Sequence, residues 1–180
     1  MVPIFRTFRQ LRPGLAALLI LATAGPAVAD GWRATHVQGV VLSLVDHTWH
    51  DLARGEQLPR STTLRTLGRS HLDLAGPGIE LRLEHGAAAE LSQAESGAAI
   101  VLHAGAITVS VADGHSATIS TQSGPIRLAS GAVQIWLEGV EIGIAHVRGD
   151  VEIFDSVGTC TRLASGERAR LASSVVSLGP

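Results

Sequence analysis

The sequence predicts an all-β domain, an antiparallel β-roll or twisted β-sandwich built from about ten to fourteen short strands. Apolar and polar residues alternate with a period of two from position 32 onward, which is the signature of half-buried strands. Glycine recurs between these segments, at Gly105, Gly124, Gly131, Gly139 and Gly149. Tight turns favour glycine because they need positive φ. Together the two patterns indicate short, glycine-punctuated strands.

The first half of the domain contains less regular strand signals than the second. Its apolar positions predict strands near 37–45, 58–67, 72–74, 79–83 and 87–91. The segment 48–54 is the one helical candidate of this region, a single turn, and Trp49 is expected to anchor it in the core.

The second half alternates more cleanly and predicts further strands. They lie near 100–102, 107–111, 118–120, 126–128, 133–137, 140–144, 151–153, 161–163 and 168–171. Taken over both halves, the alternation predicts one buried face that includes Val41, Leu58, Leu74, Leu81, Leu102, Ile107, Val109, Ile119, Val133, Ile135, Ile142, Val151 and Ile153.

Residues 1–29 have the three parts of a cleavable signal peptide. Three arginines precede a short apolar run over 15–24, and Ala27-Val28-Ala29 forms a small-residue cleavage site. The run is about half as long as a membrane-spanning helix needs to be. We therefore expect cleavage after Ala29 and export to the periplasm of one domain over 30–180. No later segment is long and uncharged enough to predict a transmembrane helix.

Composition argues against a nucleic-acid partner and against an intrachain disulfide. The domain has 11 arginines and 16 acidic residues and no lysine, a formal charge of −5 with histidine neutral. A general nucleic-acid binder needs a basic stripe, so we expect no nucleic-acid partner. Cys160 is the single cysteine, which rules out an intrachain disulfide. We expect it to be a small buried residue, with an intermolecular disulfide or a reactive thiol as alternatives.

Histidines form the densest cluster of potential ligands at His47-Thr48-Trp49-His50, flanked by Asp46 and Asp51. On a helical turn His47 and His50 would share a face and could bind a metal ion, whereas on a strand they would point to opposite faces. A solvated turn is the main interpretation, with metal or ligand binding as the alternative. No serine-nucleophile elbow or phosphate-binding loop occurs, so we expect no catalytic residues, no cofactor and no enzyme activity.

Several short motifs occur in a recognisable order. They are Gly39-Val40-Val41, Trp49, Leu52, Gly55, Leu58, Leu64-Arg65-Thr66, Leu102 to Gly105, Ile107-Thr108-Val109, Ala117-Thr118-Ile119-Ser120-Thr121, Val147 to Ile153, and the closing Leu163-Ala164-Ser165-Gly166-Glu167. This order resembles the FecR-type domain family, named for the ferric-citrate regulator, over about 37–171. Where that family has a Gly-Thr-x-Phe strand, this chain reads Ser130-Gly131-Ala132-Val133.

The resemblance implies a β-rich periplasmic module that relays or scaffolds protein contacts, without catalytic residues. The regulators of that family carry a cytoplasmic anti-sigma segment and a transmembrane helix ahead of this domain. Because this sequence begins with the signal segment, we expect a stand-alone exported version. Its partner is expected to be an envelope or periplasmic protein. The alternatives are a periplasmic accessory to a separate membrane regulator, and the metal- or ligand-binding protein using His47 and His50.

Overall fold

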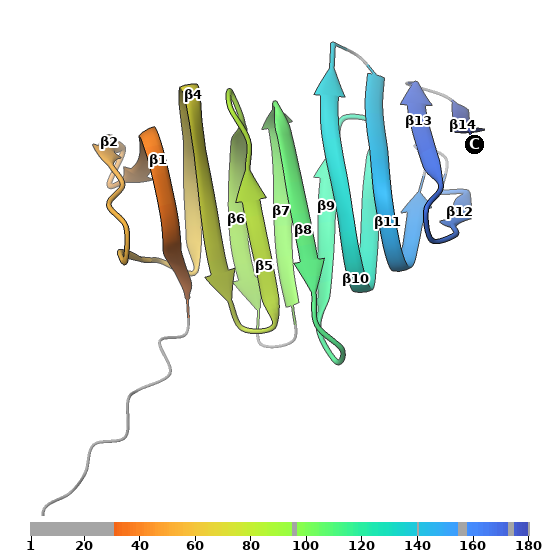
Figure 1. Ribbon diagram of the computed structural model, residues 1–180, viewed down its shortest axis with the longest axis horizontal. Coiled ribbons are helices and arrows are strands. Elements are labelled where there is room, and N and C mark those ends of the chain that lie inside the picture. The colour runs from red at the N-terminus through yellow and green to blue at the C-terminus, as the bar shows by residue number, and fades with distance from the viewer. Residues whose placement is uncertain (1–30, 95–96, 140, 155–157, 173–174, 180) are drawn as a thin grey trace, which may run out of the picture.

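The computed structural model describes residues 31–94, 97–139, 141–154, 158–172 and 175–179, and their regular structure is entirely β (Figure 1). The strands are β1 (Trp32–Val45), β2 (Thr48–Asp51), β3 (Gln57–Leu58), β4 (Ser61–Gly76), β5 (Ile79–Leu83), β6 (Ala88–Ala94), β7 (Gly97–Ala104), β8 (Ala106–Val111), β9 (Ser116–Thr121), β10 (Gly124–Glu138), β11 (Glu141–Phe154), β12 (Cys160–Leu163), β13 (Arg168–Ala172) and β14 (Val175–Gly179). The predicted fold class is confirmed. The signal segment and Ala29 lie outside the described residues.

The strands form two layers that close on each other. Hydrogen-bonded neighbours run from β10 through β8, β5, β4, β6, β7 and β9, and β9 pairs with β10 again. Within the described residues all strand pairs are antiparallel except β7–β9, which is parallel. In Figure 1 the strands β5 and β8 lie in front of β6, β7 and β9. No helix of the described residues could cross a membrane.

Four long strands contribute to both layers. The first half of β10 pairs with β9 and its second half with β8. The first half of β11 pairs with β13 and its second half with β12. One edge of β4 pairs with β6 at its start and with β5 at its end, while β1 follows the other edge. The sequence predicted two separate strands where β10 lies, and likewise for β11; each is one continuous strand with a bend.

The bend in β10 and β11 occurs at two glycines that face each other. Gly131 pairs with Gly149, with φ of 99° and 96°. A Cβ on Gly131 would lie 1.6 Å from the Arg148 carbonyl oxygen, and one on Gly149 would lie 2.2 Å from the Ser130 carbonyl oxygen. The two backbones therefore pass too close for any side chain. These glycines allow a bend within two paired strands, whereas their spacing had predicted hairpin turns between separate strands.

The core lies between the layers and agrees with the predicted alternation. All thirteen residues predicted for the buried face are buried, with exposed fractions of 5% or less. Trp32 is also fully buried, against Gly76 of β4. Each fully buried Leu, Ile or Val contributes roughly 1.5–3 kcal/mol relative to an exposed one. This aliphatic core therefore supplies the main stabilisation of the two layers.

Three local expectations are wrong. Residues 48–51 form strand β2 instead of a helical turn, because the two-residue turn Asp46-His47, with φ of 48° and 63°, returns the chain directly alongside β1. Trp49 therefore lies on the outer face of β2 and does not anchor the core. The tryptophan that is buried in the core is Trp32. Cys160 is exposed because it begins β12, which among the described residues pairs with β11 alone.

The glycine pair gives a direct test. We expect Gly149→Ala to lower the free energy of unfolding by about 2–4 kcal/mol, because strained φ and a backbone overlap add together. The matched control is Gly139→Ala, since Gly139 has φ of 64° but no neighbour within 4 Å of a Cβ. That control should lose only about 1–2 kcal/mol. Urea unfolding of residues 30–180 measures both, and equal losses would contradict this role of the close approach.

Candidate functional site

Large exposed apolar side chains gather at one end of the molecule. Among the described residues they are Val40, Trp49 and Leu67, exposed by 50%, 38% and 45%. Val40 pairs directly with Leu67 across β1 and β4, and Trp49 pairs with Leu44 across β2 and β1. We name the group Val40, Leu42, Leu44, Trp49 and Leu67 the apolar corner.

The alternation of β1 places the apolar corner on the outer face. Val41 and Ser43 are buried, so the residues between and beside them point away from the core. Leu42 and Leu44 are half-buried there and connect Val40 to Trp49 along β1. Five of the six residues at 40–45 are apolar and they lie on both faces, Ser43 being the exception; a strand with one solvated face does not need this. A group of this kind on the outside of a sheet is typical of an interaction surface.

Ser70 fixes the part of the apolar corner at the bend of β4. The Val40 N–H donates to the Ser70 hydroxyl oxygen at 2.7 Å, and that hydroxyl donates to the Leu67 carbonyl oxygen. Ser70 itself is buried. One side chain therefore holds the backbones of both exposed apolar residues.

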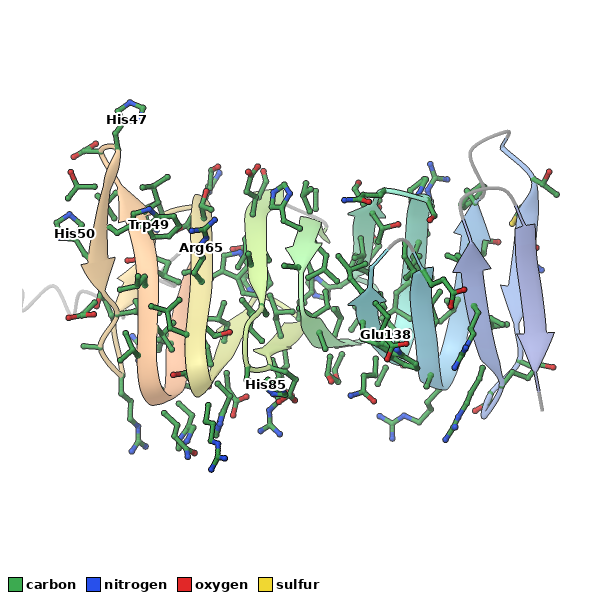
Figure 2. All side chains as sticks on the ribbon, turned by 90° about the horizontal axis from the view of Figure 1, so that it is seen from above. His47, Trp49, His50, Arg65, His85 and Glu138 are labelled. Carbon is green, nitrogen blue, oxygen red and sulfur yellow. The ribbon has the colours of Figure 1, made fainter. Side chains whose placement is uncertain are left out.

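Arg65 covers one side of the Trp49 ring. Its guanidinium carbon lies 5.2 Å from the ring centroid, within the range of a cation–π contact. Figure 2 shows Arg65 and Trp49 together, at the end of the molecule that also carries His47 and His50. Tryptophan and arginine are the residue types that most often dominate binding at protein interfaces.

The two histidines of the predicted cluster are not brought to one face. His47 lies in the β1–β2 turn and His50 lies on β2 opposite Ser43. Their side chains point in different directions in Figure 2. Among the described residues no group of three or more His, Cys, Asp or Glu side chains is arranged to hold a metal ion. The helical turn on which the metal alternative depended is absent.

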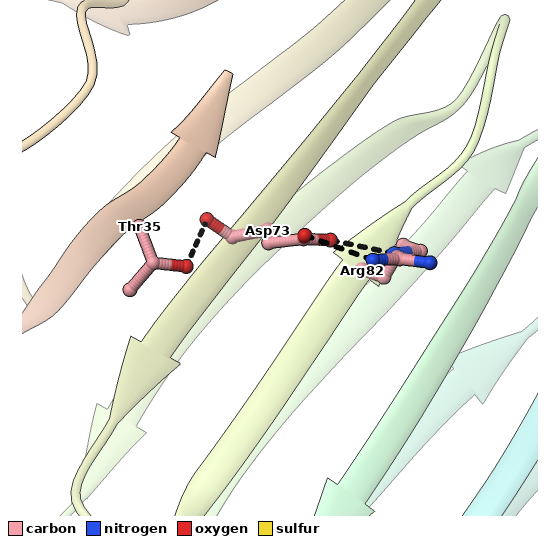
Figure 3. A network of polar contacts seen from close by, with 3 residues as sticks. All are labelled: Thr35, Asp73 and Arg82. Carbon is pink, nitrogen blue, oxygen red and sulfur yellow. Dashed lines mark hydrogen bonds and ion pairs between the residues drawn. The ribbon is translucent and has the colours of Figure 1, made fainter. Parts of the chain in front are cut away.

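A polar group separate from the apolar corner lies on the outer face of β1, β4 and β5 (Figure 3). The Arg82 Nε and Nη2 atoms donate to the two Asp73 carboxylate oxygens at 2.6 and 2.9 Å. The Thr35 hydroxyl donates to the Asp73 carbonyl oxygen at 3.0 Å. These residues line a shallow hollow of about 450 Å³ together with Glu80 and Ser110.

The ion pair sets the charge state of this group. The Arg82 hydrogen bond holds the pKa of Asp73 below its ordinary value; partial burial opposes this, and the charge of Arg82 supports it. The same hydrogen bond raises the pKa of Arg82. Asp73 is therefore ionised and already occupied by two donors, which leaves it poorly suited to act as a general base. Next to it the rings of His36 and His71 stack, with centroids 5.0 Å apart.

Sequence reasoning missed both groups. It selected His47 and His50 for their residue types, whereas Val40, Leu67 and Arg65 looked like ordinary strand residues. The available signal was the presence of apolar residues on both faces of 40–45, interrupted only by Ser43. The Asp73–Arg82 pair gave no local signal, because the two residues are brought together by the pairing of β4 with β5.

Comparison with known proteins supports the fold. No protein-family model and no curated protein matches this sequence significantly. Two crystal structures, each described as a candidate anti-sigma factor from Parabacteroides distasonis ATCC 8503, are similar to it. The first matches with a TM-score of 0.58 and 14% identity over 66% of this chain and 59% of that chain. The second matches with a TM-score of 0.56 and 13% identity over 65% of this chain and 58% of that one.

At this identity the likeness establishes a shared fold. The chain spans less than two thirds of the length of these neighbours. Its all-β architecture is therefore one that also occurs in candidate anti-sigma factors.

The Asp73–Arg82 pair predicts a pH dependence of stability. A carboxyl whose pKa is lowered by folding stabilises the fold above its unfolded pKa of about 3.9, and this stabilisation disappears as the pH falls through the folded pKa. We expect Asp73→Asn to lower the free energy of unfolding by about 1 kcal/mol at pH 7 and by much less at pH 3. Glu152→Gln, which removes the exposed pair with Arg162, is the control and should cost less at pH 7. Urea unfolding at both pH values measures this, and an equal loss at pH 3 would contradict it.

Proposed function

We propose that this chain is an exported, FecR-like domain that works by binding another protein of the cell envelope rather than by catalysing a reaction. The apolar corner is the observation that carries this proposal. Val40, Trp49 and Leu67 are exposed together on one sheet face. The chain has few large aromatic residues, and one of them, Trp49, is on this surface instead of in the core. Exposing them costs stability unless a partner covers them.

Two further observations support the FecR-like assignment. The motifs that resemble the FecR-type family run in order over about 37–171, which is nearly all of the described domain. The structural neighbours that share its fold are described as candidate anti-sigma factors, a class whose name denotes protein binding.

A role as a periplasmic accessory in signal transduction, acting with a separate membrane regulator, is the second candidate. The same structural neighbours favour it. The two candidates differ in the partner, because an accessory binds a component of a signalling system whereas a scaffold binds a structural component of the envelope. The identity of the captured partner and of the neighbouring genes separates them.

Export is tested by the N-terminus of the mature protein. We expect the chain expressed in a Gram-negative host to appear in the periplasmic fraction and to begin at Asp30, because Ala27-Val28-Ala29 fits the cleavage site. Intact-mass measurement of the fractionated protein determines this. Ala29→Arg serves as the control and should leave the precursor uncleaved. A precursor that stays intact in the wild type would contradict cleavage after Ala29.

Protein binding is tested by capture from envelope extract. We expect the tagged full chain to recover one partner in stoichiometric amount. Trp49→Ala with Leu67→Ala should reduce that recovery at least about ten-fold, since truncating a central Trp often costs about 2 kcal/mol or more of binding free energy. The matched control is Phe154→Ala, because Arg127 covers the Phe154 ring at 4.7 Å at the other end of the molecule. Quantitative mass spectrometry measures recovery. Failure of the folded chain to recover a partner, or equal recovery by both variants, would count against the proposal.

A further inference from the structure

The edge of the sheet beside the apolar corner offers unpaired backbone groups. Among the described residues β2 pairs with β1 and with no other strand. Val45 and Thr48 flank the two-residue turn and are paired, so Thr48 and His50 direct their backbone N–H and C=O groups toward β1. The next residue of this series continues the pattern, because the Leu52 N–H donates to the Val41 carbonyl oxygen at 2.8 Å.

It follows that the residues between them direct their backbone groups outward. In an antiparallel pair the groups of successive residues alternate between the two edges of a strand. The N–H and C=O groups of Trp49 and Asp51 therefore point away from β1, at the free edge. Trp49 thus combines an exposed indole with an available backbone donor and acceptor.

The side chains beside this edge specify what could pair with it. Trp49 and Asp51 lie on the outer face of the sheet, where they pair with Leu44 and Leu42 of β1. Arg65 covers the Trp49 ring from β4, so the side of the ring toward the free edge is the one left for a partner. Asp51 is exposed and makes no ion pair with the described residues.

We propose that β2 accepts an extended segment of the envelope protein partner as an added antiparallel strand. The inference rests on the proposed function and adds the place and chemistry of binding. The residue opposite Trp49 is apolar or aromatic and the residue opposite Asp51 is Arg or Lys, because directly opposed side chains share a face and interact. Since the strands are antiparallel, the partner motif reads basic, any residue, apolar from its N-terminus.

A second copy of this chain fits the edge less well. Pairing two β2 strands would set Asp51 opposite Trp49, opposite His47 or opposite the other Asp51. None of these registers gives Asp51 a permanently charged cation, and the last one opposes two carboxylates. The charge at this edge therefore favours a different protein that carries the basic residue.

The short length of β2 limits how tightly an added strand can bind through its backbone alone. Two outward residues give few main-chain hydrogen bonds, and each adds little net free energy of binding, because it replaces a hydrogen bond to water. A short edge strand is also a common protection against aggregation. Binding must therefore depend on the Trp49 side chain as well as on the backbone, which makes the two contributions separable by substitution.

The test uses a synthetic peptide, acetyl-Thr-Arg-Thr-Phe-Thr-Val-amide, and the full exported chain labelled with ¹⁵N. We expect the peptide to slow amide hydrogen exchange at Trp49 and Asp51 while leaving residues of β12 unchanged. Replacing the peptide arginine by glutamate should weaken binding about five-fold, as expected for a cross-strand charge pair. No added protection at Trp49 and Asp51 at millimolar peptide, or equal binding of both peptides, overturns the proposal.

The Asp51→Pro variant separates this inference from the proposed function. Proline removes the outward N–H of Asp51 but no hydrogen bond to β1, and proline is tolerated on edge strands. We expect the variant to unfold at the same urea concentration as the wild type and to recover the envelope partner at least about five-fold less well. If Trp49→Ala with Leu67→Ala abolishes recovery while Asp51→Pro does not, protein binding stands and strand addition is overturned. A concentration-dependent dimer that Asp51→Pro abolishes would overturn it in favour of a second copy.

Discussion

The close approach of two backbones at Gly131 and Gly149 is the constraint on which the two-layer architecture depends. A strand that serves both layers must bend without losing its pairing, and the partner strand must bend at the same place. In β10 and β11 the two glycines face each other, and each backbone occupies the volume that a side chain of the other would need. The bend is therefore a property of the pair. On one side of it the strands pair with β9 and β12, and on the other with β8 and β13.

The bend between β1 and β4 also has a glycine with positive φ, Gly39 with φ of 76°, but this glycine lies against Ser70 instead of a second glycine, and the candidate interaction surface lies beside it. There the Ser70 hydroxyl connects the two strands, accepting from Val40 and donating to Leu67. Pairing continues directly after the bend with these two residues, so their side chains stand on the outer face where the sheet turns. The bend thus explains why two apolar residues are exposed side by side, and the β1–β2 turn brings Trp49 to the same face.

Much of the fold could be predicted because it depends on local alternation. The buried residues follow from the period of two within each segment, and all thirteen predicted positions are buried. The continuity of the long strands could not be predicted in this way. In β10 the buried positions change from even numbers, as in Leu128, to odd numbers, as in Val133. Such a change of phase accompanies a turn between two strands as well as a bend within one, and only the long-range pairing of Gly131 with Gly149 distinguishes them.

The candidate site was less predictable, because its residues are ordinary strand residues whose exposure depends on tertiary pairing. Residue type alone drew attention to the histidines, whereas the exposed group consists of aliphatic side chains, one tryptophan and one arginine. The outer face of Asp73 and Arg82 shows the opposite case. Its charges are conspicuous, yet each carboxylate oxygen of Asp73 already accepts a hydrogen bond from Arg82.

The apolar corner and the face with Asp73 and Arg82 differ in how many of their groups already have a partner within the fold. This difference favours the apolar corner as the place where another protein binds. The Asp73–Arg82 pair is complete within the fold, so a ligand there would have to displace a bond that already exists. At the apolar corner the indole of Trp49, the side chains of Val40 and Leu67, and the outward backbone groups of β2 are left to solvent. The free energy falls when another protein covers apolar surface or pairs with a free strand edge. Strands β12 and β14 at the opposite end also have one partner each among the described residues, but the large exposed apolar side chains lie beside the edge of β2, next to the bend that Ser70 holds.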